Sequence, residues 1–302
     1  MNRWRGIREP RMLEGMKQTD ASSRTLRVPR PDGAEIAAEV IGSAGNPVVL
    51  LVAGADCSMD WWRPEFCELI AARGLRVVRY DQRGMGETTL GPRGTRRDGL
   101  PVAVDDALAV LDAVGATDAH WVGFSAGGWV AQLAALDHPD RVRGLTLVST
   151  SPTMFEADPD LPGATARMRE VWANPLPEPD WSDADAVVQH HVDTDRDYAG
   201  DEFDEAHDRA IWIDTVRRSP GMHRDEGGAD VFEDAPRWRE RLGEIRVPTT
   251  VVHGTADPAF PIGNGEALTR DIPGARFVAI PGGGHELPPT AWGAVVEAVA
   301  PR

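Results

Sequence analysis

Hydrophobic residues along this chain alternate between short runs typical of strands and longer amphipathic stretches typical of helices. The run at 48–52 is wholly apolar, as expected for a strand buried on both faces. Strands are predicted at 25–28, 34–41, 48–52, 75–80, 119–123, 145–148, 249–252 and 276–280, and helices at 61–73, 102–114, 127–136, 236–242, 265–271 and 291–300. This order predicts an α/β fold, a mostly parallel eight-stranded sheet with helices on both faces.

The alternation of strands and helices stops between residues 152 and 235. This stretch is rich in Asp, Glu, Pro and Trp, and helical patterns recur at 164–172, 183–191 and 204–217. We interpret 152–235 as a helical cap, or lid, inserted into a core formed by 25–151 and 236–302. Residues 1–24 show little periodicity and are expected to be a flexible N-terminal tail.

The formal net charge is −16, from 48 acidic and 32 basic residues. An acidic surface repels nucleic acid and anionic membranes, so neither is expected as a partner. A small-molecule substrate is expected instead, bound by a monomer or homodimer. The chain shows no secretory signal, no apolar run of membrane-spanning length and only Cys57 and Cys67, a pattern that favours the cytoplasm.

The segment Gly123-Phe124-Ser125-Ala126-Gly127 matches G-x-S-x-G, the pattern of a nucleophile elbow. It follows a predicted strand and opens a predicted helix, as the sharp turn of an elbow requires. Glycine on both sides of Ser125 removes side chains that would collide with the neighbouring backbone. The alternative is a glycine-rich turn with an idle serine. We predict that Ser125 is the nucleophile.

A serine hydroxyl needs a base, and the base needs a partner that orients it. Asp257 directly follows the predicted strand 249–252, and His285 lies in a glycine-rich loop after the last predicted strand. Alone, Asp257 could cap a helix and His285 could be an ordinary loop residue. The order Ser, Asp, His at successive strand ends predicts a catalytic triad of Ser125, Asp257 and His285.

Two backbone amides are expected to stabilise the oxyanion that such a triad generates. One belongs to Ala126, the residue after the nucleophile. The other is assigned to Ala55, in the loop after the strand 48–52, where Gly54 lets the backbone turn inward. The alternative for this loop is a plain turn.

Four segments together resemble the α/β-hydrolase superfamily across residues 25–302: the elbow, 80–88, 253–257 and 284–285. Within it, the segments 62–66, 79–81, 136–138 and 281–288 resemble the aclacinomycin methylesterase group of polyketide tailoring enzymes. The resemblance implies hydrolysis of a methyl ester on a polycyclic aglycone. Two residues depart from the superfamily pattern: Ala53 replaces a common histidine, and Ala126 replaces a common methionine.

The favoured hypothesis is a serine hydrolase that cleaves a carboxylic ester without a metal or an organic cofactor. Rivals with the same triad are a lactone hydrolase, a C–C bond hydrolase and a cofactor-free haloperoxidase-like enzyme. Another class is a non-catalytic small-molecule receptor or a biosynthetic cyclase. Trp172, Trp181 and Trp212 in the cap, with Gly54, are candidates for the substrate pocket, although tryptophans in a helical insertion are more often packing anchors.

Overall fold

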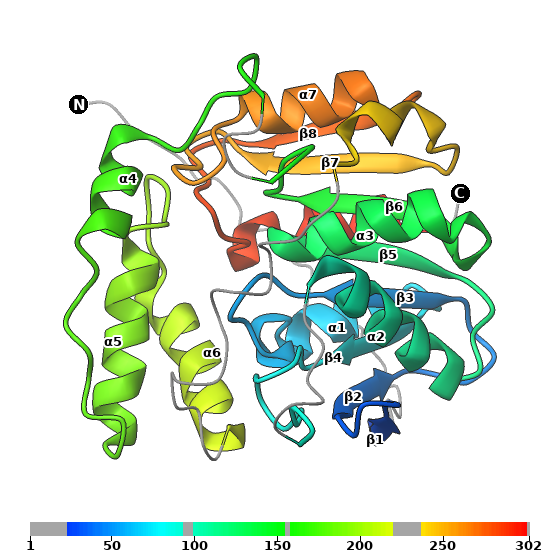
Figure 1. Cartoon of the computed structure of the whole chain (residues 1–302), viewed down its shortest axis with the longest axis horizontal. Coiled ribbons are helices and arrows are strands. Elements are labelled where there is room, and N and C mark those ends of the chain that lie inside the picture. The colour runs from blue at the N-terminus through cyan, green and yellow to red at the C-terminus, as the bar shows by residue number, and fades with distance from the viewer. Residues whose placement is uncertain (1–22, 93–98, 155–157, 220–236, 301–302) are drawn as a thin grey trace, which may run out of the picture.

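One sheet of eight strands forms the centre of the molecule, in the spatial order β1-β2-β4-β3-β5-β6-β7-β8 (Figure 1). The computed structural model describes residues 23–92, 99–154, 158–219 and 237–300. The strands are β1 Arg24–Pro29, β2 Glu35–Ile41, β3 Val48–Val52, β4 Arg76–Tyr80, β5 Ala119–Phe124, β6 Val142–Val148, β7 Thr249–Gly254 and β8 Arg276–Ile280. Strands β3 to β8 pair in parallel, and β1 and β2 pair antiparallel. The predicted fold class is confirmed.

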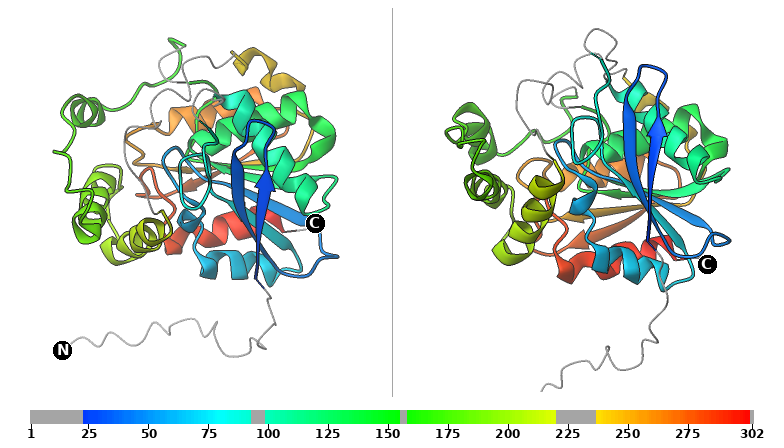
Figure 2. Two further views of the ribbon diagram at one scale, coloured as in Figure 1. Left: turned by 60° about the horizontal axis from the view of Figure 1, so that its bottom comes forward. Right: turned by 90° about the horizontal axis from the view of Figure 1, so that it is seen from below.

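Helices cover both faces of this sheet (Figure 2). The core helices are α1 Pro64–Ala71, α2 Leu100–Ala113, α3 Ala126–Asp137, α7 Gly263–Asp271 and α8 Trp292–Val299. One hydrophobic cluster joins α2, α3 and α7 to one face, and a second joins α1 and α8 to the other. Strand β3 lies between these clusters, and all five of its residues are buried. Its unbroken apolar run therefore follows from burial on both faces.

The helix predicted at 61–73 begins later, at Pro64. Proline is suited to the first turn of a helix, and it holds the preceding Arg63 in extended backbone, with ψ 146°. Met59–Trp61 instead forms the short 3₁₀ helix η1. The helix predicted at 236–242 is also different: Arg239–Glu244 forms the 3₁₀ helix η5, and residue 236 lies outside the described residues. Gly243 and Pro248 leave this segment too short for a stable α-helix before β7.

Three helices form the cap over the carboxyl ends of the strands, between β6 and β7: α4 Ala166–Ala173, α5 Ala184–Arg196 and α6 Glu205–Arg218 (Figure 1). Helices α5 and α6 pack through Val188, Val192 and Trp212. These helices fall inside the segment 152–235 that the sequence marked as an insertion. Most of the predicted tail, residues 1–22, lies outside the described residues, and β1 begins at Arg24.

The end of α6 is anchored to the core by ion pairs. Arg218 contacts Asp60 at 2.5 Å and Asp81 at 2.6 Å, and the Asp81 side chain is fully buried. One turn earlier, Thr215 shares a hydrogen bond of 2.7 Å with Ser58. Asp81 also accepts the backbone amides of Met59 and Glu87, so the ion pairs join the cap to a rigid part of the core.

Candidate active site

Ser125 lies in a strained turn between β5 and α3. Its backbone has φ 52° and ψ −122°, a conformation that L-residues rarely adopt. A Cβ on Gly123 would lie 2.3 Å from the carbonyl oxygen of Gly127, and a Cβ on Gly127 would lie 2.3 Å from that of Val52. Strand, turn and helix therefore approach at distances that only glycine permits, and this contact holds the serine at the end of the strand.

His285 links Ser125 to Asp257. Its Nε2 lies 2.9 Å from the Ser125 hydroxyl, and its Nδ1 lies 2.9 Å from Oδ2 of Asp257. The three side chains come from the ends of β5, β7 and β8, with β6 between the first two. The structure thus brings all three predicted triad residues into hydrogen-bonding contact.

The Asp257 carboxylate is held in place by its own turn. Oδ1 accepts the backbone amides of Ala259 at 2.9 Å and Phe260 at 2.8 Å, and the residue is 3% exposed. This leaves Oδ2 for the imidazole. The network favours the tautomer in which Nδ1–H donates to Asp257, so that Nε2 presents its lone pair to the serine hydroxyl. Such an arrangement can take the hydroxyl proton during attack on a carbonyl carbon.

His253 supports the turn that carries Asp257. Its Nε2 lies 2.7 Å from the Phe260 carbonyl oxygen, and the side chain is fully buried. Burial lowers the pKa of His253, although the nearby Asp257 opposes this effect. The ring is therefore neutral, donates to Phe260 and fixes the turn from behind.

The loop after β3 approaches Ser125 closely. A Cβ on Gly54 would lie 2.9 Å from the Phe124 ring and 3.3 Å from Cβ of Ser125. The Gln82 amide donates to the carbonyl oxygens of Ala53 and Gly54, at 2.6 and 2.8 Å. The Gly54 carbonyl and the Ala55 amide belong to one trans peptide and point in opposite directions. Gln82 therefore turns the Ala55 N–H away from itself.

The second predicted oxyanion amide belongs to Ala126, the first residue of α3. Among the described residues, none accepts a hydrogen bond from the amide of Ala55 or Ala126. The start of α3 also concentrates the positive end of the helix dipole at this point.

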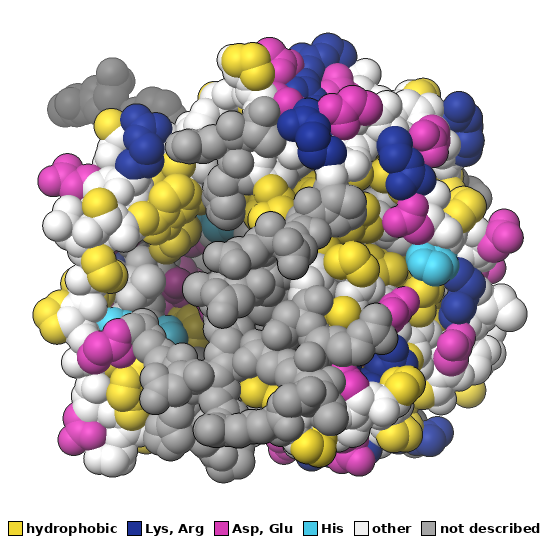
Figure 3. Space-filling model, in the orientation of Figure 1, with side chains coloured by type: hydrophobic (Ala, Val, Ile, Leu, Met, Phe, Trp, Pro, Cys, Tyr) yellow, Lys and Arg dark blue, Asp and Glu magenta, His cyan; other side chains and the backbone are white. Residues whose placement is uncertain are grey.

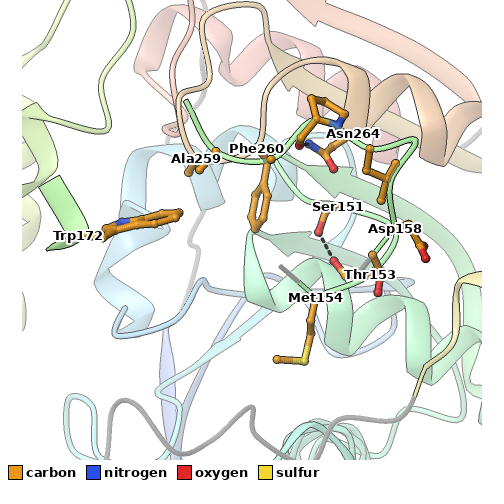
Figure 4. Close-up of a pocket in the computed structure, with 12 residues that line it drawn as sticks. Ser151, Thr153, Met154, Asp158, Trp172, Ala259, Phe260 and Asn264 are labelled. Atoms are coloured by element: carbon orange, nitrogen blue, oxygen red, sulfur yellow. Dashed lines mark hydrogen bonds between the residues drawn. The ribbon is translucent and has the colours of Figure 1, made fainter. Parts of the chain in front are cut away.

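A pocket opens between α4 and the turn after Asp257 (Figure 4). It is partly open to solvent. Trp172 reaches it from the cap and Phe260 from the core, and the Phe260 ring also contacts the His285 ring with centroids 5.3 Å apart. Its lining residues are Ser151, Thr153, Met154, Asp158, Leu161, Pro162, Gly163, Ala164, Trp172, Ala259, Phe260 and Asn264. In the space-filling view, hydrophobic side chains gather beside α4 (Figure 3).

The three cap tryptophans occupy different environments. Trp172 lines this pocket and donates from Nε1 to the Tyr198 hydroxyl at 2.6 Å. Trp212 is 7% exposed, stacks on His191 and packs inside the cap. Trp181 lies edge-on to the rings of His190 and His191. Neither Trp181 nor Trp212 is among the lining residues of this pocket.

A pair of acidic residues joins α5 to α6 near the site. Burial and, after it, the neighbouring Asp195 raise the pKa of Asp208 to about 9. Burial also raises the pKa of Asp195, while the Trp212 indole, which donates to it at 2.7 Å, opposes the shift. Two neighbouring carboxyl groups whose pKa values are both raised hold a proton between them at neutral pH.

Several residues at the site had no signal in the sequence. Gln82, Phe260 and Tyr198 act through tertiary contacts, and nothing in their local sequence distinguishes them from packing residues. Cys57 lies in the loop after β3, and burial raises its pKa well above the ordinary value, so a reactive thiolate is disfavoured. Within the described ranges, no cluster of three His, Cys, Asp or Glu residues is suited to a metal ion, and no helix is long and apolar enough to cross a membrane.

Comparison with known proteins gives consistent relatives. The family model described as alpha/beta hydrolase fold matches residues 46–290. Rhodomycin D methylesterase DauP from Streptomyces sp. (strain C5) is 31% identical over 83% of this chain and 88% of its own length. The 3-oxoadipate enol-lactonase 1 of Acinetobacter baylyi is 26% identical over 85% of this chain and 88% of its own length. A hydrolase from Pseudomonas aeruginosa PA01, known from a crystal structure, has a TM-score of 0.65 and 26% identity, covering 92% of this chain and 98% of its own. The chain therefore belongs to the α/β hydrolase fold family, as an enzyme of the hydrolase class.

Proposed function

We propose that this enzyme hydrolyses a carboxylic ester through an acyl-enzyme formed on Ser125. The observation that carries the proposal is the imidazole of His285, which lies 2.9 Å from both the Ser125 hydroxyl and the Asp257 carboxylate. A serine hydroxyl that contacts an imidazole, with a buried carboxylate on the far side of that imidazole, is arranged for nucleophilic attack.

The reaction proceeds in two halves. Oγ of Ser125 attacks the ester carbonyl carbon while His285 takes its proton, and the amides of Ala55 and Ala126 bind the developing oxyanion. The tetrahedral intermediate collapses, and the alcohol leaves with the proton from His285. Water then attacks the acyl-enzyme, again through His285, and releases the acid and the free serine. Asp257 stabilises the imidazolium in both halves.

The proposed substrate is a methyl ester carried by a polyketide or by another small apolar molecule. The relative named rhodomycin D methylesterase supports the methyl ester, and the aromatic sides of the pocket at Trp172 and Phe260 support an apolar group. The relative named 3-oxoadipate enol-lactonase 1 supports a lactone as the second candidate, because ring opening uses the same attack on a carbonyl.

A fluorophosphonate probe and p-nitrophenyl acetate test the reaction class. We expect the probe to label Ser125 and the ester to turn over, and we expect Ser125→Ala to abolish both. Folded protein with neither labelling nor turnover would refute the proposal. A matched panel of methyl esters and lactones then separates the two candidates by kcat/KM.

A further inference from the structure

A segment of the cap contacts the His285 loop through its backbone. The cap segment 198–201 follows α5, and its Tyr198 carbonyl oxygen accepts the His285 amide at 2.8 Å. The Asp201 amide donates to the Gly282 carbonyl oxygen, also at 2.8 Å. The two bonds pair residues in opposite chain order, so the segments run antiparallel, as two neighbouring strands would.

Two glycines bring these segments unusually close. A Cβ on Gly200 would lie 1.9 Å from the Gly282 carbonyl oxygen, and a Cβ on Gly284 would lie 2.2 Å from the Gly200 nitrogen. Any side chain at either position would force the two backbones apart. Neither Gly200 nor Gly284 has a positive φ. Glycine is therefore required here because there is no room for a Cβ atom, not because of the backbone conformation.

Glu286 adds a third contact at the same place. Its Oε1 accepts the Gly200 amide at 3.1 Å. The side chain is half-buried, and burial raises the pKa of Glu286, while the amides of Gly200 and Gly284 counter this effect. The residue next to His285 thus binds back to the cap segment 198–201.

The other side of the His285 loop rests on the core. The Ala256 amide donates to the Gly283 carbonyl oxygen at 2.9 Å, and a Cβ on Gly254 would lie 2.3 Å from that oxygen. The loop is therefore held between the end of β7 and the cap. The backbone amide of His285 itself is bonded on the cap side, to Tyr198.

We propose that the cap segment 198–201 positions His285, with Gly200 and Glu286 as positioning residues that act through the backbone of its loop. This inference rests on the proposed function, in which His285 is the base. Displacing the loop would change the distance from Nε2 to the Ser125 hydroxyl and so would slow proton transfer.

The first test is Gly200→Ala, assayed with p-nitrophenyl acetate. The acyl group of this ester is too small to depend on cap contacts, so a defect reports on the catalytic residues. We expect kcat to fall about tenfold to a hundredfold, with KM within about twofold of wild type, and fluorophosphonate labelling of Ser125 to slow in parallel. The matched control is Gly243→Ala, since a Cβ on Gly243 meets no atom within 4 Å.

A second test, at Glu286, remains available if Gly200→Ala fails to fold. Glu286→Ala removes the acceptor for the Gly200 amide, whereas Glu286→Gln keeps an oxygen there without a charge. We expect kcat to fall in Glu286→Ala and to recover in Glu286→Gln. Equal defects in both variants would assign the effect to charge and overturn the positioning role.

The outcomes separate the inference from the proposed function. Wild-type kcat in folded Gly200→Ala and Glu286→Ala would overturn the inference while leaving the esterase proposal intact. A wild-type protein that neither labels nor turns over would overturn the esterase proposal itself.

Discussion

At the scale of single residues, Gln82 holds the loop that follows β3 by hydrogen bonds to its backbone. Its amide binds two successive carbonyl oxygens of the loop, Ala53 and Gly54. The Gly54 carbonyl shares its peptide unit with the Ala55 amide, which points in the opposite direction. The direction in which that amide points therefore depends on a side chain from the neighbouring strand end.

Gln82→Ala tests this dependence. We expect kcat for p-nitrophenyl acetate to fall about tenfold, because the Ala55 amide loses its fixed direction. The loss in unfolding free energy should stay near 1 kcal/mol for each hydrogen bond removed. Steady-state kinetics and urea unfolding measure the two effects. Gln189→Ala, which removes bonds to Asp193 and Arg209 on the cap surface, is the control and should leave kcat unchanged.

The sequence could predict the residues whose position follows from strand ends. Ser125, Asp257 and His285 each follow a predicted strand, and parallel strands bring their carboxyl ends to one edge of the sheet. Gln82, Tyr198 and Gly200 could not be found in this way, because their importance arises from contacts between segments far apart in the chain. The predicted start of α1 at residue 61 is wrong for a local reason, because Pro64 favours the first turn of the helix.

At the scale of elements, α6 attaches the cap to the core through ion pairs. Arg218, with its side chain 20% exposed, pairs with the fully buried Asp81. Burial raises the pKa of Asp81, and the Arg218 charge opposes this effect. Without Arg218 the buried carboxylate would lose its counter-charge, which costs more than the loss of a surface ion pair.

Arg218→Met should lower the unfolding free energy by about 2–3 kcal/mol, because it leaves Asp81 buried without a cation. The neighbour Arg217 provides the control: its side chain is 70% exposed and pairs with Asp214 on the same helix. Arg217→Met should cost about 0.5 kcal/mol or less. Chemical denaturation of both variants measures the difference, and equal losses would contradict the anchoring role.

The Asp195–Asp208 pair makes the stability of the cap depend on pH. The folded-state pKa of Asp208, about 9, lies above the ordinary value of 3.8, so the folded state binds the extra proton. Its stabilising contribution is complete at low pH and is lost as the pH rises toward 9. Asp208→Asn keeps a donor for Asp195 without titrating.

We therefore expect the Tm of wild type to fall between pH 5 and pH 9, and the fall to be smaller in Asp208→Asn. Thermal unfolding followed by circular dichroism at both pH values measures this. Asp105→Asn, the same change on an exposed position of α2, is the control and should keep the wild-type slope. Parallel Tm profiles for Asp208→Asn and wild type would contradict the shared proton.

At the scale of the whole molecule, the protein carries a net charge of −16, whereas its proposed substrate is neutral. An excess of negative charge repels anionic substrates over a distance that salt shortens, from about 30 Å at 0.01 M to about 3 Å at 1 M. The charge should therefore select against anionic esters before they reach the pocket.

This repulsion can be measured with a monoanionic ester such as mono-p-nitrophenyl succinate. We expect its kcat/KM to rise severalfold as ionic strength increases, whereas p-nitrophenyl butyrate, which is neutral, should change little. If both esters respond equally to salt, the net charge plays no part in selecting the substrate.

The close approach of Gly200 to the His285 loop also limits how this enzyme can be redesigned. Exchanging caps between relatives is an obvious way to change substrate range, because the chain enters the cap after β6 and leaves it before β7. Between those two points the cap is also attached through α6 and through the close approach of Gly200 to Gly284. A chimera would need a donor cap with a glycine that reaches this position. Without that glycine, the new cap would displace the loop that carries His285.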